Sequence, residues 1–318
     1  MQFELEIIHW LQSFRNTVMD LFFQFWTLFG EELIIIAILG FLYWCYDKKV
    51  GEKVGITVFV SLVFNSIIKV LIMRPRPFVV DSTITNIRPS TAPGYAFPSG
   101  HTQGAATTFG SLAIWLKKKW VTIASIVIIT FVAISRMYLG AHYLSDVVVG
   151  ALLGIIIAYG FYIYSKKHED SSEIYKLILI GSIVIFVLGY IYYLFTADAT
   201  QSETNALVLY NNLEGVSKMI GAIVGFVVGL QFEQKIVRFS NHKIVWKNGL
   251  RFIGGILVVM AVRLILKAVF GLVIDPDNLA EGQLFQSSVA ILFDFLRYFA
   301  MVFIGIGIYP LVFKEMNI

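Results

Sequence analysis

Long apolar stretches recur along the whole chain, separated by short polar loops. Each has about the 17 to 25 residues that a helix needs to cross the hydrocarbon core of a bilayer. The pattern predicts an all-α fold, a polytopic membrane helical bundle of about nine transmembrane helices. The predicted spans are residues 31–47, 54–73, 101–117, 119–139, 142–165, 174–196, 216–233, 250–273 and 284–313.

The first 30 residues have a different pattern. Apolar side chains such as Ile7, Leu11 and Phe22 recur at helical spacing, with charged side chains interleaved. This is typical of an amphipathic helix that lies in the membrane interface or is half inserted. A full membrane span is the alternative for this segment.

Composition agrees with a membrane protein. The 318 residues are 58% hydrophobic and only 14% charged, whereas soluble domains have about 25% charged residues, so a water-soluble fold is excluded. The net charge of +4 is spread between apolar runs, and no nucleic-acid partner is expected. The single cysteine, Cys45, excludes an intramolecular disulfide and a cysteine metal site.

Basic residues occupy every second loop, beginning with the loop after the first apolar stretch. Because basic loops remain in the cytoplasm, loop 74–100 and turn 139–142 are predicted to be extracytoplasmic. Loop 74–100 nevertheless contains arginines, and an anionic ligand is the obvious explanation for basic residues on that side. We therefore expect a multi-pass protein of the cell membrane, with its functional site facing the extracytoplasmic side.

The polar segment 168–173 is the clearest break in the apolar pattern. It divides the chain after the fifth predicted span. We predict three parts: an N-terminal interfacial helix over residues 1–30, a core over 31–167, and an accessory transmembrane region of four helices over 168–318.

Lys69 and Arg76 lie seven residues apart at the end of the second apolar stretch. Seven helical steps return to within about 20° of the starting face, so both side chains would address one site. Pro75 and Pro77 end the helix there, which places Arg76 at the membrane mouth. The alternative is a pair of interfacial cations that reach for water.

Ser99, Gly100 and His101 stand at the start of the third apolar stretch. Glycine permits close backbone approach, and a helix N-terminus presents amide hydrogens and the positive end of its dipole to an anion. This arrangement favours phosphate binding. An ordinary helix cap followed by an interfacial histidine is the alternative.

His142 and Asp146 lie four residues apart at the start of the fifth apolar stretch. At this helical spacing the carboxylate holds one ring nitrogen while the other faces a substrate. Arg136 ends the preceding stretch, and its planar guanidinium suits phosphate. This is the layout of an activated nucleophile or base, although a purely structural His–Asp pair is the alternative.

Together the three motifs resemble the signature of the type 2 phosphatidic acid phosphatase (PAP2) superfamily, which also includes vanadium haloperoxidases and glucose-6-phosphatase. The signature is a lysine, six residues and Arg-Pro; then Pro-Ser-Gly-His; then Ser-Arg, five residues, His, three residues and Asp. All three parts are intact, and the resemblance covers roughly residues 31–167. It implies a membrane lipid phosphatase that needs neither a metal nor another cofactor.

By this resemblance, His142 is the nucleophile that forms phosphohistidine, Asp146 orients it, and His101 protonates the departing oxygen. The implied ligands of the phosphoryl oxygens are Lys69, Arg76, Ser99, Gly100 and Arg136. Arg74 and Arg88 lie outside the signature. They would engage a second phosphate of the substrate, or else meet only lipid head groups.

A lipid phosphate is the expected substrate, because the motifs lie at the outer ends of predicted spans, where a head group meets the interface. Undecaprenyl diphosphate is favoured, with phosphatidylglycerol phosphate or phosphatidic acid next. A membrane transporter or flippase of phosphorylated lipids that uses the same anion site is the alternative function. The membrane architecture disfavours a haloperoxidase, and a soluble sugar phosphate is a weaker alternative.

Charged residues also occur in the last two predicted spans. Arg263 and Asp294 fall at a similar depth, about 15 Å from the outer ends, and we predict that they pair. Such a pair would fix helix packing or mark a lipid pathway. For residues 168–318 a lateral wall that binds membrane lipids, a homodimer surface and a separate module all remain open.

Overall fold

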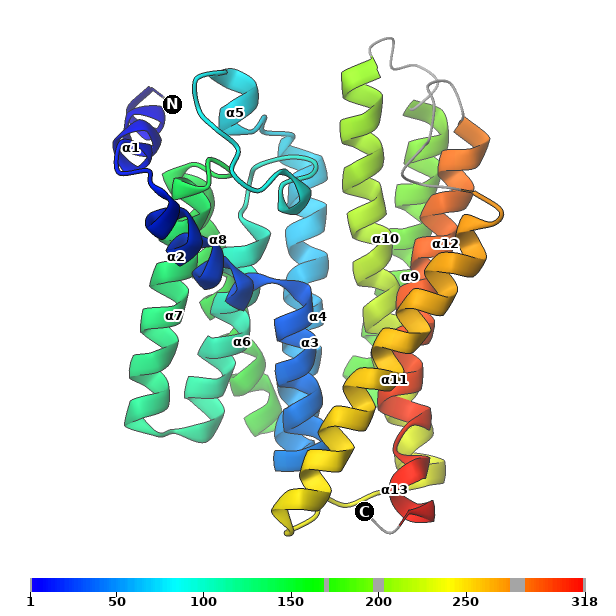
Figure 1. Ribbon diagram of the computed structural model, residues 1–318. Coiled ribbons are helices and arrows are strands. Elements are labelled where there is room, and N and C mark those ends of the chain that lie inside the picture. The colour runs from blue at the N-terminus through cyan, green and yellow to red at the C-terminus, as the bar shows by residue number, and fades with distance from the viewer. Residues whose placement is uncertain (1, 169–171, 197–202, 275–283, 317–318) are drawn as a thin grey trace. The chain divides into compact units, whose positions relative to one another are not determined.

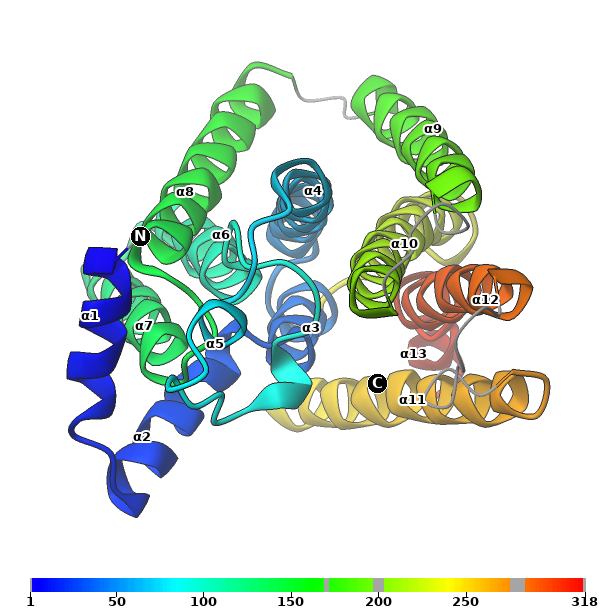
Figure 2. The same ribbon diagram turned by 90° about the horizontal axis from the view of Figure 1, so that it is seen from above.

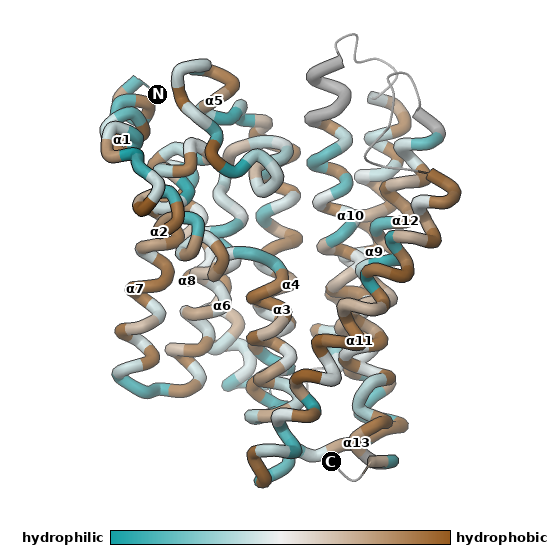
Figure 3. The backbone as a smooth tube through the Cα atoms, viewed as in Figure 1, coloured by the Kyte–Doolittle hydropathy of each residue, from teal (hydrophilic) through white to brown (hydrophobic). Residues whose placement is uncertain are grey.

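The computed structural model describes residues 2–168, 172–196, 203–274 and 284–316 (Figure 1). All the regular structure in these ranges is helical, without a strand. Apolar residues prevail along the long helices, and hydrophilic residues concentrate near helix ends and in the loops (Figure 3). The all-α membrane bundle predicted from the sequence is confirmed.

The chain divides into two compact units. Unit 1 consists of Met1–Ile36 and Ser61–Glu169, and unit 2 of Ala37–Val60 and Asp170–Ile318. These boundaries differ from the three predicted segments chiefly at residues 37–60, which belong to unit 2. The assignment of residues 1–30, 31–167 and 168–318 to separate roles stays a prediction.

Unit 1 contains the three motifs. Its helices, in chain order, are α1 (Gln2–Gln12), α2 (Thr17–Thr27), the 3₁₀ turn Leu28–Gly30, the start of α3 (Glu32–Phe41), the end of α4 (Lys48–Ile72), α5 (Pro77–Val80), the 3₁₀ turn Pro89–Thr91, α6 (Gly100–Leu116), α7 (Lys119–Tyr138) and α8 (Leu144–Lys167).

Helix α6 is the central helix of unit 1, and ten consecutive residues, Thr102 to Ser111, are buried. It packs against α7 and α8, and Figure 2 shows it between α4 on one side and α7 and α8 on the other. Glycines of α8 permit this packing: a Cβ on Gly150 would lie 2.8 Å from the Ser99 carbonyl oxygen, and one on Gly154 2.7 Å from that of Gln103. Small residues at such spacing let membrane helices approach closely.

The N-terminal segment forms two helices instead of the one expected. The break falls at residues 13–16, where the Asn16 side chain accepts a hydrogen bond from the Met19 amide and caps α2. Residues Thr17–Gly30 and Glu32–Tyr46 are bent by 50° at Glu31 and together are long enough for one broken span or a re-entrant loop. Helix α1 packs by Ile8 into an apolar cluster with Ile84 and Tyr143.

The count of nine spans is not confirmed. Seven of the described helices are long and apolar enough to cross a membrane, or eight if the bent pair is one span. The two predicted spans that fall short on their own are 31–47 and 101–117. Helix α6, with 17 residues, is only about 26 Å long, and the second arm of the bent pair is shorter still.

Unit 2 contains the remaining helices. They are the end of α3 with the π-helical turn Leu42–Tyr46, the start of α4, α9 (Ser172–Thr196), α10 (Glu203–Phe232) with the π-helical turn Glu233–Val237, α11 (Val245–Gly271), α12 (Leu284–Phe303) with the π-helical turn Ile304–Ile308, and α13 (Leu311–Glu315). Helices α10 and α12 approach closely at two glycines: a Cβ on Gly221 would lie 2.3 Å from the Phe295 carbonyl oxygen, and one on Gly225 2.4 Å from that of Phe299.

Candidate active site

Unit 1 brings the three motifs together. Arg76 donates from Nη1 to His142 Nε2 and to the Ala141 carbonyl oxygen, both at 2.9 Å. The Ser99 amide donates to the Asp146 carbonyl oxygen at 3.0 Å. Each motif is therefore hydrogen-bonded to the segment that carries His142 and Asp146, although the sequence separates them by tens of residues.

The turn before α8 fixes the position of His142. Gly140 adopts a φ of +73°, which favours glycine, and the amides of Ala141 and His142 donate to the Arg136 carbonyl oxygen at 3.0 and 3.2 Å. Asp146 Oδ2 accepts from the Tyr143 amide at 2.9 Å and so caps α8. The helix begins at Leu144, two residues later than predicted, so His142 precedes it and Asp146 lies in its first turn.

The contacts of His142 define its tautomer. An arginine can only donate, so Nε2 accepts from Arg76 and the ring proton lies on Nδ1. That nitrogen forms no hydrogen bond with the described residues, but it lies 3.4 Å from Asp146 Oδ2. The Nε2 lone pair is therefore held by Arg76, and the N–H faces a carboxylate.

The electrostatic surroundings keep His142 neutral. Its side chain is only 2% exposed. Burial, and then the positive charges of Arg76, Lys69 and Arg136, lower the pKa of His142 well below 6.5. A neutral imidazole is the form that can attack a phosphorus atom.

The buried Arg76 and Arg136 and the partly buried Lys69 lie near this histidine. Lys69 donates to the Tyr95 carbonyl oxygen at 2.7 Å, and Arg76 to those of Pro93 and Gly94 at 2.7 and 3.0 Å. The guanidinium of Arg136, which is fully buried, donates to hydroxyl and carbonyl oxygens. Within the described ranges, none of the three forms an ion pair with a carboxylate. Buried charges are normally paired, so this excess of positive charge is suited to an anion.

Helix α6 supplies the second motif. The Ser99 hydroxyl accepts from the Thr102 amide at 3.4 Å and exchanges a hydrogen bond with the Thr102 hydroxyl at 3.0 Å, so it caps the helix that starts at Gly100. His101 follows, with Nε2 buried and without a hydrogen-bond partner in the described structure. Gly30 lies against it, since a Cβ there would be 2.7 Å from the His101 carbonyl oxygen. The broken span thus passes directly beside the site.

Arg74 and Arg88 are both engaged by carboxylates. Arg74 pairs with Asp146 and with Glu4, each at 2.7 Å, and Arg88 pairs with Glu31 at 2.7 Å. Neither guanidinium faces the site unpaired, which differs from the expectation that they would be available to a second phosphate. A role of either arginine toward a second phosphate stays a prediction.

A buried polar network between α4 and α6 was not predicted. Gln103 donates to the Ser61 carbonyl oxygen and hydroxyl at 2.9 and 3.0 Å and accepts from Asn65 at 2.8 Å. Ser61 and Thr107 exchange a further hydrogen bond at 2.8 Å. Asn65 lies one helical turn before Lys69, and a polar amide within a predicted span was the available signal.

The predicted pair of Arg263 and Asp294 is wrong. Asp294 is paired with Arg297 on its own helix and lies 3.9 Å from Lys218 of α10, which also binds Glu214. Depth along two spans does not fix how each helix is rotated, and the local partner at i+3 is nearer.

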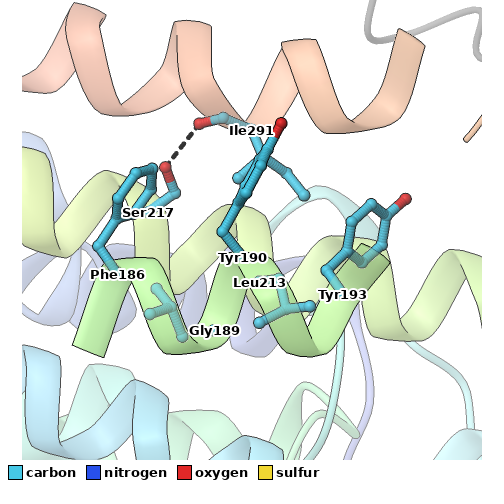
Figure 4. A pocket seen from close by; sticks show the side chains of 8 residues that line it. Phe186, Gly189, Tyr190, Tyr193, Leu213, Ser217 and Ile291 are labelled. Carbon is cyan, nitrogen blue, oxygen red and sulfur yellow. Dashed lines mark hydrogen bonds between the residues drawn. The ribbon is translucent and has the colours of Figure 1, made fainter. Parts of the chain in front are cut away.

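Unit 2 also holds a small pocket (Figure 4), lined by Phe186, Gly189, Tyr190, Tyr193, Leu213, Val216, Ser217 and Ile291. No predicted site residue lines it.

Comparisons with known proteins agree with the motifs. The model of the PAP2 superfamily matches residues 53–170, and that of the PAP2 superfamily phosphatase transmembrane extension matches 217–318. The second match lies in a region that the motifs alone did not assign to the family.

Curated relatives match half of this chain or more. Undecaprenyl-diphosphatase BcrC of Bacillus subtilis is 30% identical over 173 residues, 52% of this chain and 84% of that protein. An undecaprenyl-diphosphatase of Sulfolobus acidocaldarius is 26% identical over 177 residues, 55% and 82% of the two chains. Sphingosine-1-phosphate phosphatase 1 of Mus musculus is 24% identical over 255 residues, which are 76% of this chain and 58% of that protein. The identity and extent of the first match show that this chain belongs to the PAP2 superfamily, as a phosphatase with membrane-spanning helices.

Proposed function

We propose that this protein hydrolyses a phosphate ester or anhydride of a membrane lipid at the extracytoplasmic face, through a phosphohistidine intermediate. The observation that carries the proposal is the neutral His142, which accepts from Arg76 and lies among three cations, two of them buried, that have no carboxylate partner in the described ranges. A phosphoryl group supplies the negative charge that these cations lack.

In the first step, Arg76 transfers its hydrogen bond from His142 Nε2 to a phosphoryl oxygen. The freed lone pair of Nε2 attacks phosphorus while the bond from phosphorus to the leaving oxygen breaks. His101, whose Nε2 is buried and unpartnered in the described structure, donates a proton to that oxygen. The bound phosphate favours the protonated form of His101, because its negative charge offsets the cations nearby. The His142 N–H faces Asp146, which stabilises the positive charge that develops on the ring.

In the second step, a water molecule attacks the phosphohistidine and His101 accepts its proton. The bond from phosphorus to Nε2 breaks and inorganic phosphate leaves. Lys69, Arg76 and Arg136, with the Gly100 amide and the Ser99 hydroxyl, hold the phosphoryl oxygens and stabilise their charge in both transition states. No step requires a metal or another cofactor.

For the substrate we favour undecaprenyl diphosphate, because two of the relatives that this chain covers over most of their length are named undecaprenyl-diphosphatases. Phosphatidylglycerol phosphate and phosphatidic acid are next. The paired state of Arg74 and Arg88 gives the diphosphate no additional support.

Phosphate release by detergent-purified protein in EDTA tests the function. The panel comprises undecaprenyl diphosphate, phosphatidylglycerol phosphate, phosphatidic acid and glucose 6-phosphate. His142→Ala should abolish release, while His168→Ala, an exposed histidine at the end of α8, should leave it unchanged. A folded wild-type protein that releases phosphate from no lipid, or a His142→Ala variant that remains active, would refute the proposal.

A labelling experiment tests the side of the membrane. With Cys45 replaced by serine, single cysteines are introduced as Ser82→Cys, in loop 74–100, and as Lys118→Cys, between α6 and α7. Both positions are exposed. A membrane-impermeant maleimide added to intact cells should label the first and not the second. The opposite pattern contradicts an extracytoplasmic site.

A further inference from the structure

Helix α1 contributes a carboxylate to the surroundings of the nucleophile. Glu4 Oε2 accepts from Arg74 Nη2 at 2.7 Å, and Arg74 Nη1 donates to Asp146 Oδ1 at 2.7 Å. The other oxygen of Asp146 faces His142 Nδ1. A continuous line of charged contacts therefore runs from the N-terminal helix to the nucleophile, and all of it lies within unit 1.

A second set of hydrogen bonds fixes the geometry of this line. Glu4 Oε1 accepts from the amide and the hydroxyl of Ser145 at 2.9 and 2.6 Å, and Arg74 Nη1 also donates to that hydroxyl at 2.6 Å. The Arg74 guanidinium lies over the Tyr143 ring at 3.9 Å. The carboxylate thus binds both the arginine and the first turn of α8, from which Asp146 projects.

The balance of charge gives Glu4 a function beyond anchoring. Arg74 alone would neutralise Asp146 and weaken its attraction for a positively charged His142. With Glu4 present, the group of Glu4, Arg74 and Asp146 carries one net negative charge. The side chains of Glu4 and Arg74 are only 15% and 20% exposed, so solvent screens this charge less than it would at an open surface.

We propose that Glu4 is a positioning residue of the phosphatase reaction: it holds Arg74 so that Asp146 keeps both its orientation and its effective negative charge toward His142. This inference rests on the proposed phosphohistidine mechanism. It also explains why Arg74, next to the motif Arg76-Pro77, is not available as a head-group ligand.

The test measures kcat and KM for the lipid phosphate that the wild-type protein hydrolyses best. Glu4→Gln keeps the shape of the side chain and removes its charge. We expect kcat to fall about 10-fold, equivalent to about 1.4 kcal/mol of transition-state stabilisation, with KM within twofold. Glu4→Asp should recover part of the loss, because it restores the charge.

Two matched controls come from the same helix. Glu6→Gln removes an equal charge from an exposed side chain of α1 and should leave kcat unchanged. His9→Ala breaks the contact of α1 with Asp81, 2.9 Å long, and so weakens anchoring of the helix without altering the charge near Asp146. Its kcat should stay within twofold of wild type.

Three outcomes overturn the inference: a Glu4→Gln variant with wild-type kcat, one that raises KM at constant kcat, or a loss no larger than that of His9→Ala. Thermal unfolding in detergent shows that the variants are folded. Failure of the proposed function differs from failure of this inference. In the first case the wild-type protein itself releases no phosphate, whereas in the second the wild-type protein is active and only the expected effect of Glu4→Gln is missing.

Discussion

The close approach of α8 to α6 at Gly150 should control alignment of the two halves of the site. A Cβ at this position would lie 2.8 Å from the Ser99 carbonyl oxygen and 3.5 Å from the Ser99 nitrogen. Both are backbone atoms and cannot rotate away. Since ordinary contacts of a Cβ begin near 3.4 Å, Gly150→Ala requires the helices to separate by about 0.6 Å, the difference between 3.4 and 2.8 Å.

That displacement falls directly on the proposed catalytic groups. The Ser99 amide donates to the Asp146 carbonyl oxygen at 3.0 Å, Ser99 precedes Gly100 and His101, and Asp146 contacts His142. A misplacement of about 1 Å costs about 10²-fold in rate, so about 0.6 Å should lower kcat about 10-fold. Overpacking of this kind also destabilises by about 1–3 kcal/mol, which should lower the unfolding temperature.

The assay compares phosphate release and thermal unfolding in detergent for Gly150→Ala and Gly160→Ala. Gly160 lies on the same helix, and a Cβ there meets nothing within 4 Å, so its replacement should leave kcat unchanged and should not lower the unfolding temperature. Wild-type kcat for Gly150→Ala would refute the reasoning that this contact sets the alignment. An equal loss for both variants would assign the effect to α8 as a whole.

Three further predictions follow from the site. Burial and then Arg76 lower the pKa of His142 below 6.5, so the nucleophile stays neutral as the pH falls through 6.5. The acid limb of the pH profile of kcat/KM should therefore lie below pH 6.5, and an acid limb at or above pH 6.5 contradicts this prediction. Gln103→Leu removes three hydrogen bonds to Ser61 and Asn65 and should destabilise by about 3 kcal/mol, measured by denaturant unfolding. EDTA dialysis should leave phosphate release unchanged, and a loss restored by Mg²⁺ would contradict the mechanism.

The convergence of the motifs could be predicted because it depends only on their position along the spans. Alternation of basic loops placed the ends of the second, third and fifth stretches on one side of the membrane. Residues at those ends were therefore expected to lie close together. In the structure Arg76 is hydrogen-bonded to His142, and the Ser99 amide to the Asp146 carbonyl oxygen. The chemistry expected of each residue still depends on the tests described above.

Features that depend on rotation or bending of a helix could not be predicted in this way. At the bend at Glu31, Gly30 lies against His101 of α6, and no local signal in an apolar run predicts that contact or the angle. Asp294 pairs with Arg297 and not with Arg263. This pairing could not be predicted, because hydropathy gives the depth of a residue in the membrane but not the face of the helix on which it lies. Glu4 contacts Arg74 only because α1 folds back over the loop that follows α4.

The pairing of buried charges separates the two kinds of polar cluster in this protein. In unit 2, the fully buried Glu233 is matched by Lys48, and Lys218 by Glu214, so opposite charges offset each other and the clusters stabilise packing. In unit 1, among the residues that the structure describes, Lys69, Arg76 and Arg136 are held by neutral oxygens and by the His142 ring. Such an arrangement costs stability, and binding of an anion would offset that cost. The sequence shows which residues are charged, but only the folded chain shows which of them have no carboxylate partner, and that difference supports the proposed phosphate site.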